Sequence, residues 1–155
     1  MCLMQAAALL TALVVAPALP AIAGARTTSI AWLDYEPGLA RAAKEGKFVI
    51  VEFSTPWCHA CKRMDKDAFS DPGVIKKLQA AFIAVHVDAD QRRDLSSRFG
   101  VFGYPTVFVL DSKGATVCQR AGYMSREEFT ALMDYVLTGA YRNTGLMDYL
   151  NFRKK

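Results

Sequence analysis

Cysteine and histidine are scarce in this chain of 155 residues, which has four cysteines and two histidines. One Cys-x-x-Cys pair occurs, at Cys58 and Cys61, and the chain has neither a second such pair nor a His-x-x-x-His sequence. A tetrahedral zinc site needs four ligands at suitable spacing. The sequence therefore favours a redox-active dithiol, with a structural disulfide as the alternative and part of a metal site as the least favoured interpretation.

The chain also has little excess of charge of one sign, since its net charge of +4 is spread along the sequence. A nucleic-acid-binding domain carries a clustered basic patch, so we expect no nucleic-acid partner. Internal repeats, low-complexity segments and linkers rich in proline, glycine and serine are absent as well. We therefore expect a single domain over residues 26–139, followed by a tail over residues 140–155.

The first 25 residues contain no charged side chain. They carry an apolar run over residues 6–16, two prolines at Pro17 and Pro20, and a small-residue segment that ends at Ala25. This pattern predicts a secretory signal peptide over residues 1–25, cleaved after Ala25, although its start lacks the usual basic residues. A membrane anchor is the alternative, but the prolines interrupt the run well short of the roughly 20 apolar residues that span a bilayer. We therefore expect export to the periplasm.

Apolar periodicity and capping signals predict helices over residues 32–46, 58–69, 72–81, 92–99 and 125–137. Runs rich in valine, isoleucine and phenylalanine predict strands over residues 47–54, 82–87, 106–110 and 115–120. Strands separated by helices predict parallel crossovers, and a turn at residues 111–114 predicts a closing antiparallel hairpin. The expected fold class is α/β, a mixed sheet with helices on both faces. The tail is expected either as a short docked helix or as a mobile segment.

The Cys58–Cys61 pair follows a buried strand and opens a helix. Unpaired backbone N–H groups and the positive end of the helix dipole favour a thiolate at Cys58. Cys61 is close enough to resolve a mixed disulfide. This setting favours thiol–disulfide exchange, which requires no bound cofactor and no metal.

The sequence resembles the thioredoxin superfamily over residues 47–137. The resemblance rests on a strand, then Trp-Cys-His-Ala-Cys-Lys at 57–62, then Gly-Tyr-Pro-Thr at 103–106 before a third strand, and Gly122 after a fourth. With Phe-Ser-Asp-Pro at 69–72, it is most similar to the periplasmic carboxy-terminal domain of DsbD and its free-standing secreted relatives. The resemblance implies a thioredoxin fold.

The resemblance also implies roles for individual residues. Cys58 would be the attacking thiolate and Cys61 the buried resolving thiol. Pro105 would be a cis proline beside the dithiol, with an ordinary trans turn proline as the alternative. The backbone of Tyr104 would pair with a substrate peptide, and Trp57 would either shield the site or simply pack.

Glu52 stands where the family has a buried acid. A carboxyl inside an apolar strand should have a raised pKa and could exchange a proton with Cys61. An edge-strand carboxylate facing water is the alternative. His86 is expected to be packed or exposed, although an interaction with Glu52 is conceivable, and Cys118 is expected to be a small buried hydrophobe.

The function that we expect is an exported thiol:disulfide oxidoreductase, monomeric, acting on disulfide- or thiol-bearing exported proteins. The resemblance to DsbD favours a reductase fed by a membrane electron donor. His59 lies between the cysteines, and a protonated imidazole there would favour an oxidant or isomerase. A copper chaperone that uses Cys58, His59 and Cys61, or an adaptor without chemistry, is a weaker alternative.

Overall fold

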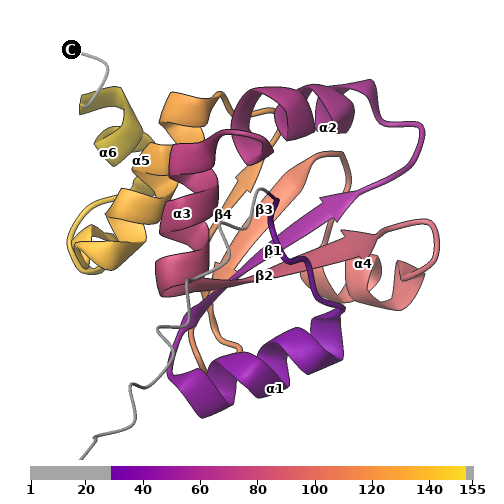
Figure 1. Cartoon of the computed structure of the whole chain (residues 1–155), viewed down its shortest axis with the longest axis horizontal. Coiled ribbons are helices and arrows are strands. Elements are labelled where there is room, and N and C mark those ends of the chain that lie inside the picture. The colour runs from indigo at the N-terminus through magenta and orange to yellow at the C-terminus, as the bar shows by residue number, and fades with distance from the viewer. Residues whose placement is uncertain (1–28, 153–155) are drawn as a thin grey trace, which may run out of the picture.

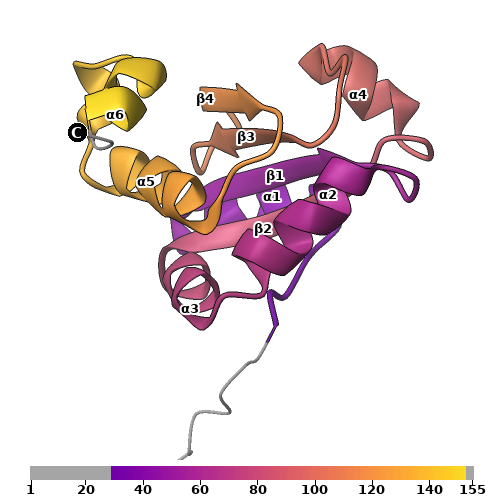
Figure 2. The same ribbon diagram turned by 90° about the horizontal axis from the view of Figure 1, so that it is seen from above.

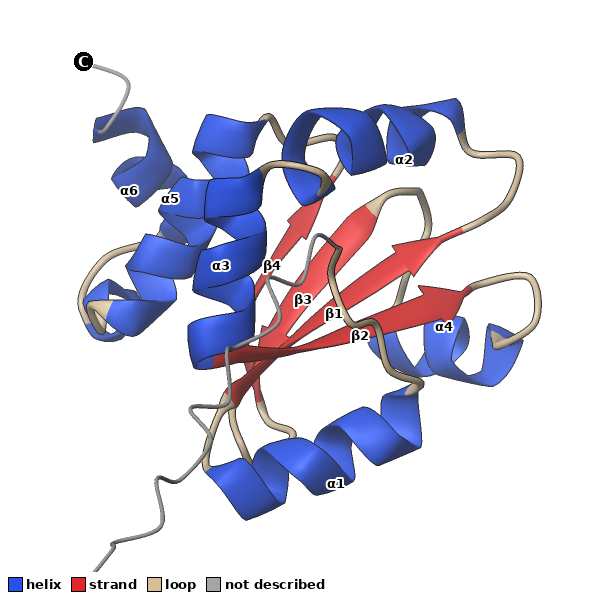
Figure 3. Cartoon of the chain, in the orientation of Figure 1, coloured by secondary structure: helices blue, strands red, loops and turns tan. Residues whose placement is uncertain are grey.

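The computed structural model describes residues 29–152, so the predicted signal peptide lies outside the described residues. Along the chain, the helices and strands follow the order α1 (Tyr35–Glu45), β1 (Phe48–Ser54), α2 (His59–Met64), η1 (Asp65–Phe69), α3 (Pro72–Ala81), β2 (Phe82–Asp88), α4 (Arg93–Phe99), β3 (Thr106–Leu110), β4 (Thr116–Ala121), α5 (Arg126–Leu137), η2 (Ala140–Arg142) and α6 (Leu146–Phe152). The four strands form one layer with helices on both sides (Figures 1 and 3). The α/β class predicted from the sequence is confirmed.

The sheet has the strand order β2-β1-β3-β4. Strands β1 and β2 are parallel, whereas β3 is antiparallel to both β1 and β4. The expectation of a second parallel crossover, through α4 into β3, is therefore wrong. Helix α4 packs near the end at which β2 leaves the sheet, where the ring of Phe99 lies 5.3 Å from that of Phe53 close to the end of β1. The chain therefore re-enters the sheet from the end at which β2 leaves it.

Side chains alternate between two cores along β1. Val49, Val51 and Phe53 face the core formed with α1 and α4. Ile50 faces the larger core, which is formed with α2, α3 and α5. Glu52 has the same parity as Ile50, so its carboxyl lies on the α2 face of the sheet.

Capping sets several helix boundaries. Asp71 accepts hydrogen bonds from the backbone N–H groups of Gly73 and Val74 at 2.9 and 3.0 Å, and this cap starts α3. Ser125 and Glu128 form the predicted capping box of α5. The first helix begins three residues later than predicted, because residues 32–33 instead run beside β2.

The carboxy-terminal segment forms a short helix, which was one of the two expectations for the tail. Helix α6 lies beyond α5, on the side away from the strands (Figure 2). Leu150 is buried, and the rings of Tyr135 and Tyr149 pack 5.2 Å apart. Tyr135 Oη also donates a hydrogen bond to the carbonyl of Thr144 at 2.6 Å. Within residues 29–152, every helix is too short or too polar to cross a bilayer.

Candidate functional site

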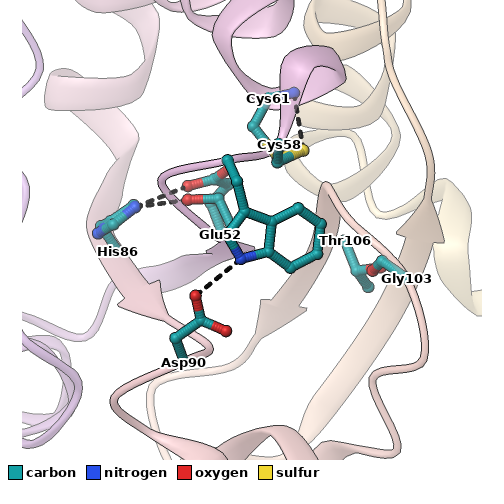
Figure 4. The surroundings of a disulfide bond; sticks show 9 residues. Glu52, Cys58, Cys61, His86, Asp90, Gly103 and Thr106 are labelled. Atoms are coloured by element: carbon teal, nitrogen blue, oxygen red, sulfur yellow. Dashed lines mark hydrogen bonds and ion pairs between the residues drawn. A yellow bond between two sulfur atoms is a disulfide. The ribbon is translucent and has the colours of Figure 1, made fainter.

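Cys58 and Cys61 are joined by a disulfide at the start of α2 (Figure 4). Cys58 is the N-cap of the helix, and the backbone N–H of Cys61 donates a hydrogen bond to Cys58 Sγ at 3.1 Å. The same N–H can stabilise negative charge on that sulfur after reduction. Both residues are buried, at 6% and 3% exposed, and the more accessible one is Cys58. This geometry fits Cys58 as the entry point for exchange.

Trp57 lies at the rim of the site and is 62% exposed. Its indole Nε1 donates a hydrogen bond to Asp90 Oδ2 at 2.9 Å, and its ring packs edge-on against Tyr104 with centroids 5.9 Å apart. These two contacts hold the indole beside the disulfide without burying it. The exposed ring presents apolar surface to solvent next to the sulfurs.

The peptide bond between Tyr104 and Pro105 is cis, as the resemblance implied, so the trans alternative is wrong. Two hydrogen bonds hold this loop. Thr106 Oγ1 donates to the carbonyl of Gly103 at 2.7 Å, and the backbone N–H of Gly122 donates to the carbonyl of Pro105 at 2.8 Å. Gly122 has φ of 88°, a conformation that favours glycine. The loop that follows β4 is thereby tied to the cis proline at the start of β3.

Glu52 is only 2% exposed, and it lies on a central strand. The alternative of an edge-strand carboxylate facing water is therefore wrong. Burial, and then the negative charge of Asp65, raises the pKa of Glu52 to about 8, while hydrogen bonding from Ser54 opposes this shift. Asp65 follows Cys61 by four residues, and its N–H donates to the carbonyl of Cys61. Residues so spaced share a helix face, so Glu52 lies beneath the face that carries Cys61.

His86 makes the contact with Glu52 that the sequence left open. Its Nε2 lies 2.7 Å from Ser54 Oγ and 3.5 Å from Glu52 Oε2. The imidazole is 43% exposed, and its ring also packs edge-on against Trp32. The buried carboxyl is therefore connected to solvent through an imidazole (Figure 4).

The remaining predicted residues lie outside this cluster. His59 is exposed at the first position of α2. Cys118 is a free, partly buried thiol on the edge strand β4, and burial raises its pKa to about 12. Residues 29–152 contain no group of three or more histidine, cysteine or acidic side chains arranged to hold a metal ion.

Four residues of the site were not found from the sequence: Ser54, Asp65, Asp90 and Phe102. The sequence could have indicated the first two. Ser54 is two residues from Glu52 on a strand, and Asp65 is four residues from Cys61 on a helix, so each spacing places the two side chains on one face. Phe102 had none, yet it is fully exposed. It lines a groove of about 420 Å³ that also includes Asp90 and Tyr104, the two residues that contact Trp57.

Comparisons with known proteins agree with this geometry. The thioredoxin-like domain family matches residues 35–137. The thiol:disulfide interchange protein DsbD of Salmonella paratyphi A is 32% identical over 120 residues, which make up 74% of this chain and 21% of that protein. This chain thus spans about a fifth of the length of that relative.

Two solved structures are similar over most of their length. A thioredoxin from Thermus thermophilus has a TM-score of 0.65 and 32% identity, with 70% of this chain and 88% of that chain covered. A putative disulphide-isomerase from Bacteroides thetaiotaomicron has a TM-score of 0.62 and 30% identity, with 76% and 98% covered. With the fold, the cis proline and the paired cysteines in place, these matches show that the chain belongs to the thioredoxin-like domain family.

Proposed function

We propose that this protein is an exported thiol:disulfide oxidoreductase that reduces disulfides of partner proteins. The observation that carries the proposal is the Cys58–Cys61 disulfide at a helix start, above a buried carboxyl with a raised pKa. A dithiol in this position can donate two electrons. A carboxyl beneath it can accept the proton that the second thiol must lose. The 32% identity to a thiol:disulfide interchange protein supports the same chemistry.

In the proposed reaction, the Cys58 thiolate attacks one sulfur of a partner disulfide. A mixed disulfide forms, and the other partner sulfur leaves as a thiolate that takes a proton from water. Cys61 then loses its proton to Glu52 and attacks Cys58 Sγ, so the Cys58–Cys61 bond forms and the second partner sulfur leaves. The partner disulfide is reduced to two thiols, and the protein's dithiol is oxidised to a disulfide.

The substrate would bind across the rim formed by Trp57, Tyr104 and Pro105. The aromatic rings of Trp57 and Tyr104 supply apolar surface, and the groove beside them extends this surface to Phe102. His59 is exposed next to Cys58, where it can contact the partner. We propose that these residues select protein segments that carry an apolar side chain near the reactive cysteine.

Two further parts of the proposal concern where the protein acts and what reduces it. The uncharged, apolar sequence over residues 1–25 supports export to the periplasm. Each turnover leaves the Cys58–Cys61 pair oxidised, so two electrons must be supplied before the next. We propose that a membrane electron donor resembling DsbD supplies them, and that the protein acts as a monomer.

The second candidate is an oxidant or isomerase acting in the same compartment. It is favoured by His59, which can add positive charge beside the Cys58 thiolate and so stabilise the reduced form. The 30% identity to a putative disulphide-isomerase also favours it. The two candidates differ in the direction of electron flow.

A redox titration against glutathione tests the direction. A potential near thioredoxin's, about −270 mV, supports a reductase, and a potential near DsbA's, about −120 mV, supports an oxidant. Insulin reduction with dithiothreitol tests the activity itself. In the exported fraction, Cys61→Ser should trap partner proteins in mixed disulfides, whereas the matched control Cys58→Ser should trap none. The redox proposal fails if the wild type does not reduce insulin and Cys61→Ser traps nothing.

A further inference from the structure

Arg63, Asp67 and Tyr123 form a cluster that includes the helix of the disulfide. The guanidinium of Arg63 lies over the ring of Tyr123, 4.4 Å from its centroid. Arg63 Nε donates a hydrogen bond to Asp67 Oδ2 at 3.3 Å, and Tyr123 Oη donates one to the same oxygen at 2.7 Å. The arginine is therefore held by two neighbours, one on its own helical segment and one on a distant loop.

This cluster connects the helix of the dithiol with the loop between β4 and α5 (Figures 1 and 2). Arg63 is on α2, and Asp67 is on η1, which continues from it. Tyr123 follows Gly122, whose backbone N–H donates to the carbonyl of the cis proline, Pro105. The cluster is thus joined directly to the loop at which we propose that a partner segment binds.

Arg63 also lies on the same face of α2 as the exposed residue beside the first cysteine. His59 follows Cys58 and is exposed. Residues four apart share a helix face, and four residues place Arg63 about 6 Å farther along the helix axis than His59. A partner segment that reaches Cys58 and continues along this face therefore passes the Arg63 guanidinium.

Arg63 is held in place and yet remains open to solvent, because its side chain is 69% exposed. A guanidinium carries five N–H donors in a rigid fork. Asp67 bonds to the Nε donor, so the terminal amino groups are the donors that remain for a ligand. A guanidinium that is already stacked and hydrogen-bonded loses less rotamer entropy on binding than a free one. Arg63 is therefore preorganised for a carboxylate, which matches the fork with two parallel hydrogen bonds.

The surrounding charges also favour an anion. Lys62 and Lys66 are exposed on the same helical segment, and neither is ion-paired within residues 29–152. Two acids lie on this segment as well. Asp67 is engaged with Arg63, and the charge of Asp65 acts on the buried carboxyl of β1. The exposed face of the segment therefore presents an excess of positive charge to an approaching partner.

We propose that Arg63, fixed by Tyr123 and Asp67, binds a carboxylate of the partner protein close to its reactive cysteine. This inference rests on the proposed function and names its substrate class, which is disulfides flanked by an acidic side chain. Arg63 is then a specificity-determining residue, whereas Tyr123 and Asp67 are positioning residues. The contact adds a charged requirement to the apolar surface supplied by Trp57 and Tyr104.

The test is the reduction of synthetic peptides by the pre-reduced protein. Each peptide carries one cysteine in a mixed disulfide with 2-mercaptoethanol and one glutamate within about three residues of it, and the matched peptide has glutamine at that position. Exposed ion pairs contribute modestly, so the second-order rate constant should be about threefold to fivefold higher for glutamate, on one side of the cysteine only. The preference should fall towards equality in about 0.5 M NaCl, which screens exposed charges.

Variants assign the preference to the arginine. Arg63→Gln should reduce the paired peptides at equal rates, and Arg63→Lys, which keeps the charge and loses the planar fork, should retain only part of the preference. Tyr123→Phe keeps the ring under the guanidinium and should retain more of the preference than Tyr123→Ala. Two controls should keep most of it: Lys66→Gln removes a neighbouring cation, and Arg142→Gln removes an exposed arginine that lies 5.2 Å from the ring of Tyr141.

The preference is a ratio of two rates measured on one variant, so a general loss of folding or activity cancels. Equal rates for the paired peptides in the wild type would overturn the inference. A preference that survives in Arg63→Gln would overturn it too. The same holds if Lys66→Gln removes the preference as fully as Arg63→Gln does, because the overall charge of the helix would then explain it.

A binding measurement does not depend on turnover. Peptides with serine in place of cysteine cannot react, and in the oxidised, ¹⁵N-labelled protein the Arg63 Nε–Hε signal should shift more with the glutamate peptide than with the glutamine peptide. Identical shifts would overturn the inference. If the pre-reduced wild type reduces none of the peptides while this signal still distinguishes the two, the proposed function fails and the carboxylate contact stands.

Discussion

Replacing Glu52 with glutamine should stabilise the oxidised protein, and the gain should grow with pH. The folded-state pKa of Glu52 is raised from its ordinary 4.5 to about 8, chiefly by burial. The folded protein therefore binds more protons than the unfolded chain between these two values, and its stability falls as pH rises through that range. Glutamine has nearly the shape of the protonated acid and never ionises, so the variant avoids this loss.

The magnitude follows from the same shift. At 1.36 kcal/mol per pKa unit, moving the pKa from 4.5 to about 8 corresponds to about 5 kcal/mol at high pH. The expected gain of Glu52→Gln is about 1 kcal/mol at pH 5 and about 5 kcal/mol at pH 9. The difference of about 4 kcal/mol is a large share of the 5–15 kcal/mol that is usual for a domain. With a urea m-value of about 2 kcal/mol/M, it corresponds to a midpoint shift of roughly 2 M.

Urea unfolding at pH 5 and pH 9 measures this gain. The protein should be kept oxidised, so that the cysteine thiols do not titrate. Glu127→Gln is a matched control, because hydrogen bonds lower the pKa of this exposed carboxylate, and its removal should not stabilise the protein as pH rises. An equal gain at both pH values, or a less stable Glu52→Gln at pH 9, would refute the argument that the buried charge is costly.

Three further predictions follow from contacts of the described residues. Asp65→Asn should lower the pKa of Glu52, since the Asp65 charge raises it; a ¹³C titration that stays near pH 8 contradicts this. Phe102→Ser should lower kcat/KM for insulin about tenfold, because a bound protein segment would cover this exposed ring and burying a phenylalanine contributes about 1.5–3 kcal/mol. It should leave the rate with glutathione disulfide unchanged, and equal losses on both substrates would argue against the groove. Ser125→Ala removes the α5 cap and should cost about 1 kcal/mol in urea unfolding, with Ser112→Ala, in the turn before β4, as the control.

Local sequence patterns predicted most of the helices and strands. Helix α3 was predicted at its observed bounds because Asp71 and Pro72 are strong starting signals, and β3 because a short apolar run stands between a proline turn and a polar turn. The direction of β3 was mispredicted, because it depends on which end of the sheet α4 packs against. That position is a property of the folded arrangement and leaves little trace in local patterns.

The site divides in the same way. The sequence by itself determined the cysteine pair at a helix start and an acid in an apolar strand, because spacing along one chain segment sets both. Only the tertiary structure decided that β1 is central, so that Glu52 is buried, and that β2 pairs with it in a register that puts His86 opposite Glu52. Strand order and register come from pairing between distant segments. The sequence predicted a raised pKa for Glu52, but the strand order that buries it and the neighbouring charge of Asp65 came only from the tertiary structure.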